Sequence, residues 1–295
     1  MPRLLNWSDA LKLGRVSNLP TVWTNTLAAV VLAGGTAADP GVFLPLLLAM
    51  TLFYVGGMYL NDAFDAEIDA RQRPERAIPS GRVARSTVFA LGFAMLAAGV
   101  AVVLWLSTAG SGRTGFLPVL AALGLCAAIV FYDWYHKTNP LSPVVMGLCR
   151  ALVYVTAGLA VAAPLPDALL AGALLLLCYL IGLTYTAKQE NLGEVKNLWP
   201  LLFLAAPVVY GAMLAAGRPV AVAFLLPFAA WLLWALHLVR RRAPGDIPRA
   251  VVSMLAGICL FDALVIAGAG RPELAIVAVL GFGLTLLLQR YVPGT

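Results

Sequence analysis

Long apolar stretches, separated by short polar segments, run through the whole chain. A helix needs about 20 consecutive apolar residues to cross the hydrocarbon core of a bilayer, and ten stretches reach or approach that length. They are residues 20–36, 43–60, 85–107, 115–132, 142–163, 167–187, 198–216, 219–239, 250–268 and 273–291. The pattern predicts an all-α polytopic transmembrane bundle of nine to ten spans, since two neighbouring stretches can also form one broken helix.

The composition supports the same class of protein. Hydrophobic residues make up 61% of the 295 residues, and the mean hydropathy is +0.89. A soluble globular domain contains about 45–50% apolar residues, so the composition excludes that class. The longest mainly polar stretch, residues 61–84, is too short for a separate domain. We therefore expect one integral membrane domain over residues 1–295.

Lysine and arginine residues concentrate in alternate loops. With ten spans, sixteen fall on one side of the membrane and three on the other, while Arg150 lies inside a span. Cytoplasmic loops are the ones enriched in Lys and Arg, so we expect both termini in the cytoplasm and the protein in a bacterial cytoplasmic membrane. The net charge of +6 then reflects topology and contact with anionic lipid rather than nucleic-acid binding.

The N-terminal segment, residues 1–18, has no continuous apolar core of the kind found in a cleavable signal peptide. Its mixture of charges and leucines predicts an amphipathic helix on the cytoplasmic membrane surface. The side chains expected to face lipid are Leu4, Leu5, Leu11 and Leu13, and those expected to reach headgroups are Arg3, Lys12 and Arg15.

An acidic cluster directly follows the second apolar stretch. Asn61, Asp62, Asp65 and Asp69 fall within one arc of about 100° on a helix, with Glu67 on the opposite side. They lie near a helix C-terminus, where the macrodipole disfavours negative charge, so a positive partner is expected. Mg²⁺ prefers such oxygen ligands and leaves room for substrate phosphates. The alternative is a solvated helix end. Four arginines suited to phosphate oxygens follow at Arg71, Arg73, Arg76 and Arg82.

A second polar segment begins at Tyr132, after the fourth apolar stretch. Lys137, with His136, is a candidate for binding a diphosphate; the alternative is that Asp133 and Lys137, four residues apart, form a surface ion pair. Trp134 and Tyr135 are either aromatics of the membrane interface or rings that stabilise an allylic cation.

Two further polar sites are predicted. A buried membrane arginine normally faces a cavity or a partner, so Arg150 is expected to contact phosphate or an acid, and Asp262 a partner that the sequence does not name. After the sixth stretch, Glu190 and Glu194 lie one turn apart and are candidates for a second Mg²⁺; alternatively they belong, with Lys188 and Lys196, to a mixed solvated face.

The Asn61–Asp69 spacing, the Arg-Pro-x-Arg-x-Ile-Pro-Ser-Gly-Arg stretch from Arg73 to Arg82 and the Tyr132–Lys137 segment together resemble the UbiA superfamily of intramembrane prenyltransferases, over roughly residues 10–240. The resemblance implies a helical bundle in which Mg²⁺ and a prenyl diphosphate bind, diphosphate leaves, and an aromatic or other lipophilic acceptor captures the allylic cation. The implied metal ligands are Asn61, Asp62, Asp65, Asp69, Glu190 and Glu194. The implied catalytic residues are Asp62, Asp65 and Lys137, and the implied substrate-binding residues are Asn61, Arg76, Tyr132, His136, Arg150 and Lys188.

The chain departs from that family in its later motifs. Family members usually carry a second aspartate-rich motif, where this chain has only Glu190 and Glu194, and the usual Tyr-x-x-x-Lys-Arg pattern places His136 at the lysine position. The Met-Gly-Leu-Cys-Arg sequence from Met146 to Arg150 and the acid at Glu190 are similar to an EboC-like branch, whose members are associated with handling or export of a specialised metabolite precursor. Two alternative functions therefore remain open besides prenyl transfer. One is an intramembrane terpene cyclase, and the other is a non-catalytic carrier or exporter of a lipid or metabolite precursor.

Overall fold

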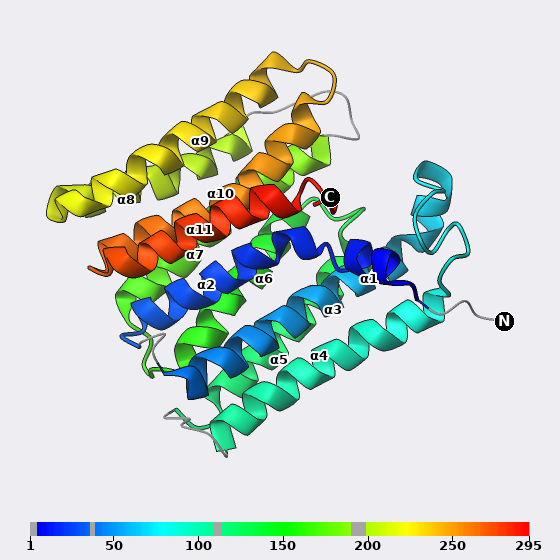
Figure 1. The fold of residues 1–295 in the computed structure, drawn as a ribbon, viewed down its shortest axis with the longest axis horizontal. Coiled ribbons are helices and arrows are strands. Elements are labelled where there is room, and N and C mark those ends of the chain that lie inside the picture. The colour runs from blue at the N-terminus through cyan, green and yellow to red at the C-terminus, as the bar shows by residue number, and fades with distance from the viewer. Residues whose placement is uncertain (1–4, 36–38, 109–113, 190–198, 295) are drawn as a thin grey trace.

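The fold is a bundle of long helices, shown by a computed structural model that describes residues 5–35, 39–108, 114–189 and 199–294 (Figure 1). The described residues form eleven α-helices and three short 3₁₀-helices. The α-helices are α1 (Trp7–Leu13), α2 (Leu19–Leu32), α3 (Pro40–Gln72), α4 (Arg85–Thr108), α5 (Leu117–Tyr135), α6 (Ser142–Leu159), α7 (Asp167–Gln189), α8 (Ala205–Gly217), α9 (Val222–Arg241), α10 (Asp246–Gly268) and α11 (Pro272–Leu288). The 3₁₀-helices are η1 (Val16–Asn18), η2 (Trp199–Leu204) and η3 (Pro219–Ala221).

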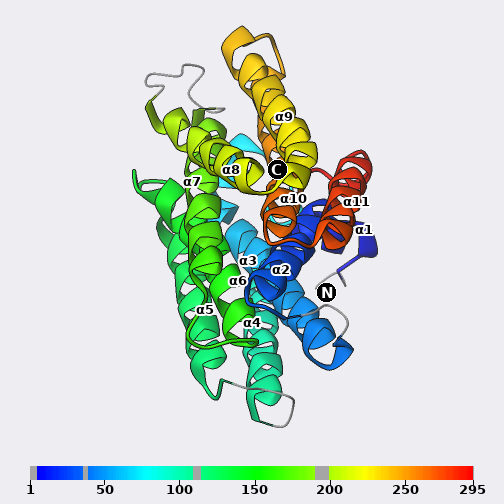
Figure 2. The same ribbon diagram turned by 90° about the vertical axis from the view of Figure 1, so that its left-hand side faces the viewer.

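The predicted spans correspond to helices, and the all-α membrane fold is confirmed. Eight helical segments of the described chain are long and apolar enough to cross a membrane: α3, α4, α5, α6, α7, α10 and the continuous segments Trp199–Gly217 and Pro219–Arg241. The first and last predicted stretches form the shorter helices α2, with 14 residues, and α11, with 17. Helix α2 packs against α3, α6, α10 and α11, so it lies inside the bundle (Figures 1 and 2).

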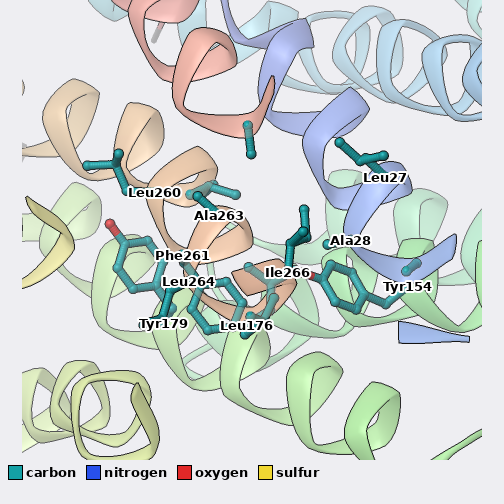
Figure 3. Packing of buried hydrophobic residues seen from close by; sticks show 14 of the residues in the cluster. Leu27, Ala28, Tyr154, Leu176, Tyr179, Leu260, Phe261, Ala263, Leu264 and Ile266 are labelled. Carbon is teal, nitrogen blue, oxygen red and sulfur yellow. The ribbon is translucent and has the colours of Figure 1, made fainter. Parts of the chain in front are cut away.

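The largest core cluster surrounds α10, whose apolar window is 83% buried. Figure 3 shows Phe261 and Leu264 of α10 close to Tyr179 of α7, with Tyr154 of α6 near Ala28 of α2. Small residues let these helices approach: a Cβ atom added at Gly147 of α6 would lie 2.9 Å from the Leu177 carbonyl oxygen on α7. The backbones of α6 and α7 therefore lie close together at this point.

Helix α3 carries the acidic motif on the same continuous helix as the second apolar stretch. Its 33 residues rise about 50 Å, whereas a bilayer core is about 30 Å thick. The helix begins at Pro40, capped by the Asp39 side chain, and ends at Gln72. Its last turns, from Asn61 onward, therefore extend toward one face of the membrane.

The N-terminal segment differs from its prediction as a lipid-facing surface helix. Leu13 is 2% exposed and packs with Tyr59 of α3, and the Tyr59 hydroxyl donates to the Ala10 carbonyl oxygen at 3.2 Å. Arg82, in the segment after α3, donates to the Asp9 carboxylate of α1 at 3.0 Å and is a second contact that holds α1 in place. The expectations that Leu13 faces lipid and that Arg15 reaches headgroups were wrong, because α1 docks on α3 and directs Arg15 inward.

Candidate active site

The polar end of α3 presents three buried side chains to the inside of the bundle. Asn61, Asp65 and Asp69 are 7%, 4% and 3% exposed, while the Glu67 side chain is 82% exposed and binds Arg85 of α4 at 2.9 Å. The predicted separation of Glu67 from the other acids is confirmed. It follows from helical periodicity alone.

Basic side chains from three other segments face this surface. The Arg15 Nη2 atom lies 3.0 Å from Asp62 Oδ1 and 3.3 Å from Asn61 Oδ1, and Arg76 Nη1 lies 2.7 Å from Asp69 Oδ2 and 3.4 Å from Asp62 Oδ1. The Lys137 Nζ atom lies 3.0 Å from Asp65 Oδ2. Each aspartate of the motif thus has a cationic partner, as carboxylates this far from water require.

Arg15 stays charged in this position. Burial disfavours its charge, but the neighbouring Asp62 carboxylate offsets burial and raises the pKa of the Arg15 guanidinium above its ordinary value. Its backbone lies in the left-handed region, with φ 40° and ψ 48°, a conformation that costs a residue with a side chain of order 1–3 kcal/mol. Such strained positions cluster at functional sites, and this one aims a guanidinium at the aspartates.

The side chains of Asn61, Asp62, Asp65 and Asp69, together with Arg15, Arg76 and Lys137, form a cluster. This cluster lies at the mouth of a cavity of about 280 Å³. Its polar lining includes Arg15, Asn61, Asp65, Asp69, Arg73, Arg76, Tyr132, Asp133, His136, Lys137 and Arg150. Its apolar lining includes Val22, Met50, Phe53, Leu125, Ile129, Val153, Leu180, Leu183 and Leu255. The arrangement suits a molecule with an anionic head and a hydrocarbon tail.

The second polar segment contributes Tyr132 to Lys137 at the end of α5. The Tyr132 ring stacks on His136 at 4.8 Å between centroids, and His136 Nε2 lies 3.5 Å from Asp65 Oδ2. Asp133 is 4% exposed and accepts a hydrogen bond from Asn61, so the alternative of an exposed Asp133–Lys137 ion pair was wrong. Trp134 and Tyr135, which are 68% and 46% exposed, lie outside the set of cavity-lining residues.

Arg150 lies deeper, at the junction of α2 and α6. It donates to Asn25 Oδ1 at 2.9 Å and to Thr21 Oγ1 at 3.1 Å, and its guanidinium lies 5.5 Å from the Tyr54 ring centroid. Asn25 also donates to Asp262 Oδ2 at 2.9 Å. Asn25 thus connects the buried arginine with the buried aspartate.

Asp262 is fully buried in α10 and accepts hydrogen bonds from three side chains. Thr24 donates at 2.6 Å, Asn25 at 2.9 Å and Tyr154 at 2.5 Å. The partners that the sequence could not name therefore come from α2 and α6. The polar residues Thr21, Thr24, Asn25 and Thr26, inside the first apolar stretch, were a signal that could have indicated the partners on α2.

Lys188 makes its hydrogen bonds outside the acidic and basic cluster. Lys188 donates to the Asn139 carbonyl oxygen at 2.8 Å and to Ser142 Oγ at 2.7 Å, and so ties the end of α7 to the α5–α6 connection. Its predicted substrate-binding role has no support in these contacts and stays a prediction. Glu190 and Glu194 lie outside the described residues.

The donor set at the mouth fits a hard divalent cation in its chemistry. Carboxylate and amide oxygens predominate, and the guanidinium and ammonium groups beside them show that the site accepts positive charge. One buried oxygen of the site, Asp133 Oδ2, has no hydrogen-bond partner within residues 5–35, 39–108, 114–189 and 199–294. Among the described residues, no three His, Cys, Asp or Glu side chains are already gathered at metal-binding distances.

Fold and site together define a polytopic helical membrane protein with a charged mouth leading into an apolar cavity. The model of the UbiA prenyltransferase family matches residues 22–258, and the chain belongs to that family.

Relatives with assigned names are similar over part of the chain. Digeranylgeranylglyceryl phosphate synthase from Metallosphaera sedula is 33% identical over 122 residues, covering 41% of this chain and 40% of the relative. The synthase from Methanopyrus kandleri is 33% identical over 138 residues, covering 46% of each. The matches thus span less than half the length of these relatives.

Solved structures share the fold over nearly the whole chain. A digeranylgeranylglyceryl phosphate synthase structure aligns with a TM-score of 0.61 at 16% identity, covering 88% of this chain and 97% of the other. A UbiA homologue from Archaeoglobus fulgidus, bound to DMAPP and Mg²⁺, aligns with a TM-score of 0.52 at 15% identity, covering 97% and 100%.

Proposed function

We propose that this protein is a Mg²⁺-dependent intramembrane prenyltransferase that moves an isoprenoid chain from a prenyl diphosphate to an aromatic or other lipophilic acceptor. The observation that carries the proposal is the clustering of three aspartates and three cations at the polar mouth of a cavity whose deeper walls are mainly apolar, with Arg150 as an exception. A diphosphate with a hydrocarbon tail has the matching distribution of charge.

In this function the acidic and the basic side chains of the cluster have different roles. Asn61, Asp62, Asp65 and Asp69 would hold Mg²⁺, which when bound supplies positive charge to the diphosphate leaving group. Arg15, Arg76 and Lys137 exchange carboxylate oxygens for diphosphate oxygens, which stabilises the charge that develops as the carbon–oxygen bond breaks. The apolar walls keep water from the allylic cation until the acceptor captures it.

Relatives support the proposal at the level of substrate class. An A. fulgidus UbiA homologue binds DMAPP and Mg²⁺, another structure of it holds GPP and Mg²⁺, and several relatives are named for a prenylated glyceryl phosphate product. For this chain we propose an aromatic or other lipophilic acceptor, with a glyceryl phosphate lipid as one candidate of the second kind. The bias of basic residues toward one set of loops supports an active site that faces the cytoplasm. A bacterial inner membrane is part of the same proposal.

The test uses purified protein in detergent with Mg²⁺ and prenyl diphosphates of several lengths, with and without both acceptor classes. We expect diphosphate release coupled to a prenylated acceptor, lost in Asp65→Asn and retained in the matched control Glu67→Gln, on the opposite face of α3. Release without acceptor, with a cyclic product, would instead identify a terpene cyclase. Binding without release would identify a carrier.

A further inference from the structure

Asp133 lies at the charged mouth of the cavity, and neither the ion pairs nor the proposed metal ligands described so far include it. It lies in the last turn of α5, is 4% exposed, and lines the same cavity as Asn61, Asp65 and Asp69. It therefore brings a carboxylate to the acidic face of α3 from a second helix.

Its hydrogen bonding is incomplete. Oδ1 accepts one hydrogen bond, from Asn61 Nδ2 at 3.1 Å, while Oδ2 is buried and has no partner in the part of the chain that the structure describes. Asp62, Asp65 and Asp69 each contact a basic side chain, whereas no ion pair joins Asp133 to any residue of the described chain. A buried carboxylate with one neutral donor is costly, so the position calls for a cation.

The contact with Asn61 links Asp133 to the predicted metal ligands. Because Nδ2 of Asn61 donates to Asp133, the amide oxygen of Asn61 points the other way, toward Arg15 at 3.3 Å. Arg15 thus contacts both Asn61 and Asp62. Arg15, Asn61 and Asp133 all line the same cavity, so a cation bound there next to the Asn61 side chain lies near the Asp133 carboxylate as well.

We propose that Asp133 is a ligand of the divalent cation at the Asn61–Asp69 site, an inference that rests on the proposed Mg²⁺-dependent function. One helix face presents few oxygens to a cation that takes six in octahedral geometry. A carboxylate from α5 completes the site from a second direction. It also adds negative charge in a chain whose later acidic motif holds only Glu190 and Glu194.

The experiment measures Mn²⁺ binding to the purified protein by electron paramagnetic resonance, without prenyl substrate, both alone and with inorganic diphosphate. Asp133→Asn keeps an oxygen that accepts from Asn61 but removes the charge, and Asp133→Leu removes both. Asp65→Asn is the positive control, and Glu67→Gln is the matched negative control. We expect Asp133→Asn to weaken Mn²⁺ binding by about tenfold or more, and Asp65→Asn to weaken it to a similar extent.

Thermal unfolding supplies a second readout. Asp133→Asn is expected to unfold at the same or a higher temperature than the wild type without metal, because an unpaired buried charge is removed, and to lose the stabilisation that Mn²⁺ gives the wild type. Wild-type affinity in Asp133→Asn together with weak binding in Asp133→Leu would overturn the ligand role and leave only positioning of Asn61. A wild type that binds no Mn²⁺, with or without diphosphate, would overturn the proposed function as well.

Discussion

The guanidinium of Arg15 lies 3.0 Å from the carboxylate of Asp62 and joins the N-terminal segment to the acidic motif. The Tyr54 hydroxyl donates to the Arg15 carbonyl oxygen at 3.2 Å and so fixes the same residue through its backbone. Since the Arg15 backbone is also held in the left-handed region, the fold places this cation at the cavity mouth before any substrate binds.

Replacing Arg15 by Gln is expected to lower kcat/KM for the prenyl diphosphate by about 100-fold, the loss typical of removing one oriented group that stabilises developing charge. Steady-state diphosphate release measures it. Arg85→Gln is the matched control, because Arg85 binds Glu67 on the far face of α3 and does not line the cavity. Equal losses in the two variants would show that general surface charge, and not the Arg15 position, supports turnover.

Local periodicity accounts for what could be predicted here. The spacing of Asn61, Asp65 and Asp69 on a helix depends only on neighbours in sequence, and so does the apolar length of each span. The Arg15–Asp62 contact joins residues 47 positions apart. Nothing near Arg15 in the sequence distinguishes a guanidinium that reaches a headgroup from one that turns inward, because the direction is set by the docking of α1 on α3.

Distance along the sequence also explains why the partners of Asp262 could not be predicted. Thr24 and Asn25 are more than 230 positions away from Asp262. A polar residue within a span indicates that some partner exists, because an unsatisfied group in the membrane interior is costly. Which helix supplies the partner depends on how α2, α6 and α10 pack.

Tyr154→Phe is expected to lower the free energy of unfolding by about 1.5–3 kcal/mol, because the Asp262 carboxylate loses one of three donors. Unfolding in detergent, by heat or by a denaturing surfactant, measures the change. Tyr291→Phe, at a position 75% exposed, removes a hydroxyl of the same kind and should leave stability unchanged. If both variants unfold alike, the buried network does not contribute measurably to stability.

The double variant Glu190→Gln, Glu194→Gln tests the predicted second metal site directly. If these carboxylates bind Mg²⁺, the concentration of Mg²⁺ needed for half-maximal diphosphate release should rise about tenfold. A Mg²⁺ titration of activity measures it. Glu75→Gln, an exposed acid beyond the end of α3, serves as the control. An unchanged Mg²⁺ requirement in the double variant would place Glu190 and Glu194 on a solvated face, the alternative reading of that segment.

The length of prenyl chain that the cavity accepts should depend on Met50. This residue is fully buried, lines the cavity, and precedes Asp65 on α3 by 15 residues, or about 22 Å of helix rise. A tail that enters from the charged mouth reaches Met50 only if it is long. Met50→Trp should therefore lower kcat/KM for long prenyl diphosphates much more than for short ones, and Met50→Ala should shift the ratio the other way.

The ratio of kcat/KM values for a long and a short prenyl diphosphate, measured with the same preparation, removes differences in the amount of active protein. Leu48→Trp adds the same ring to α3 at a position 52% exposed and outside the charged-mouth cavity, so its ratio should equal that of the wild type. Opposite shifts in Met50→Trp and Met50→Ala would identify Met50 as a point that limits chain length. Parallel losses for all chain lengths would show that the tail leaves the cavity before reaching this depth, because only a side chain in its path can discriminate by length.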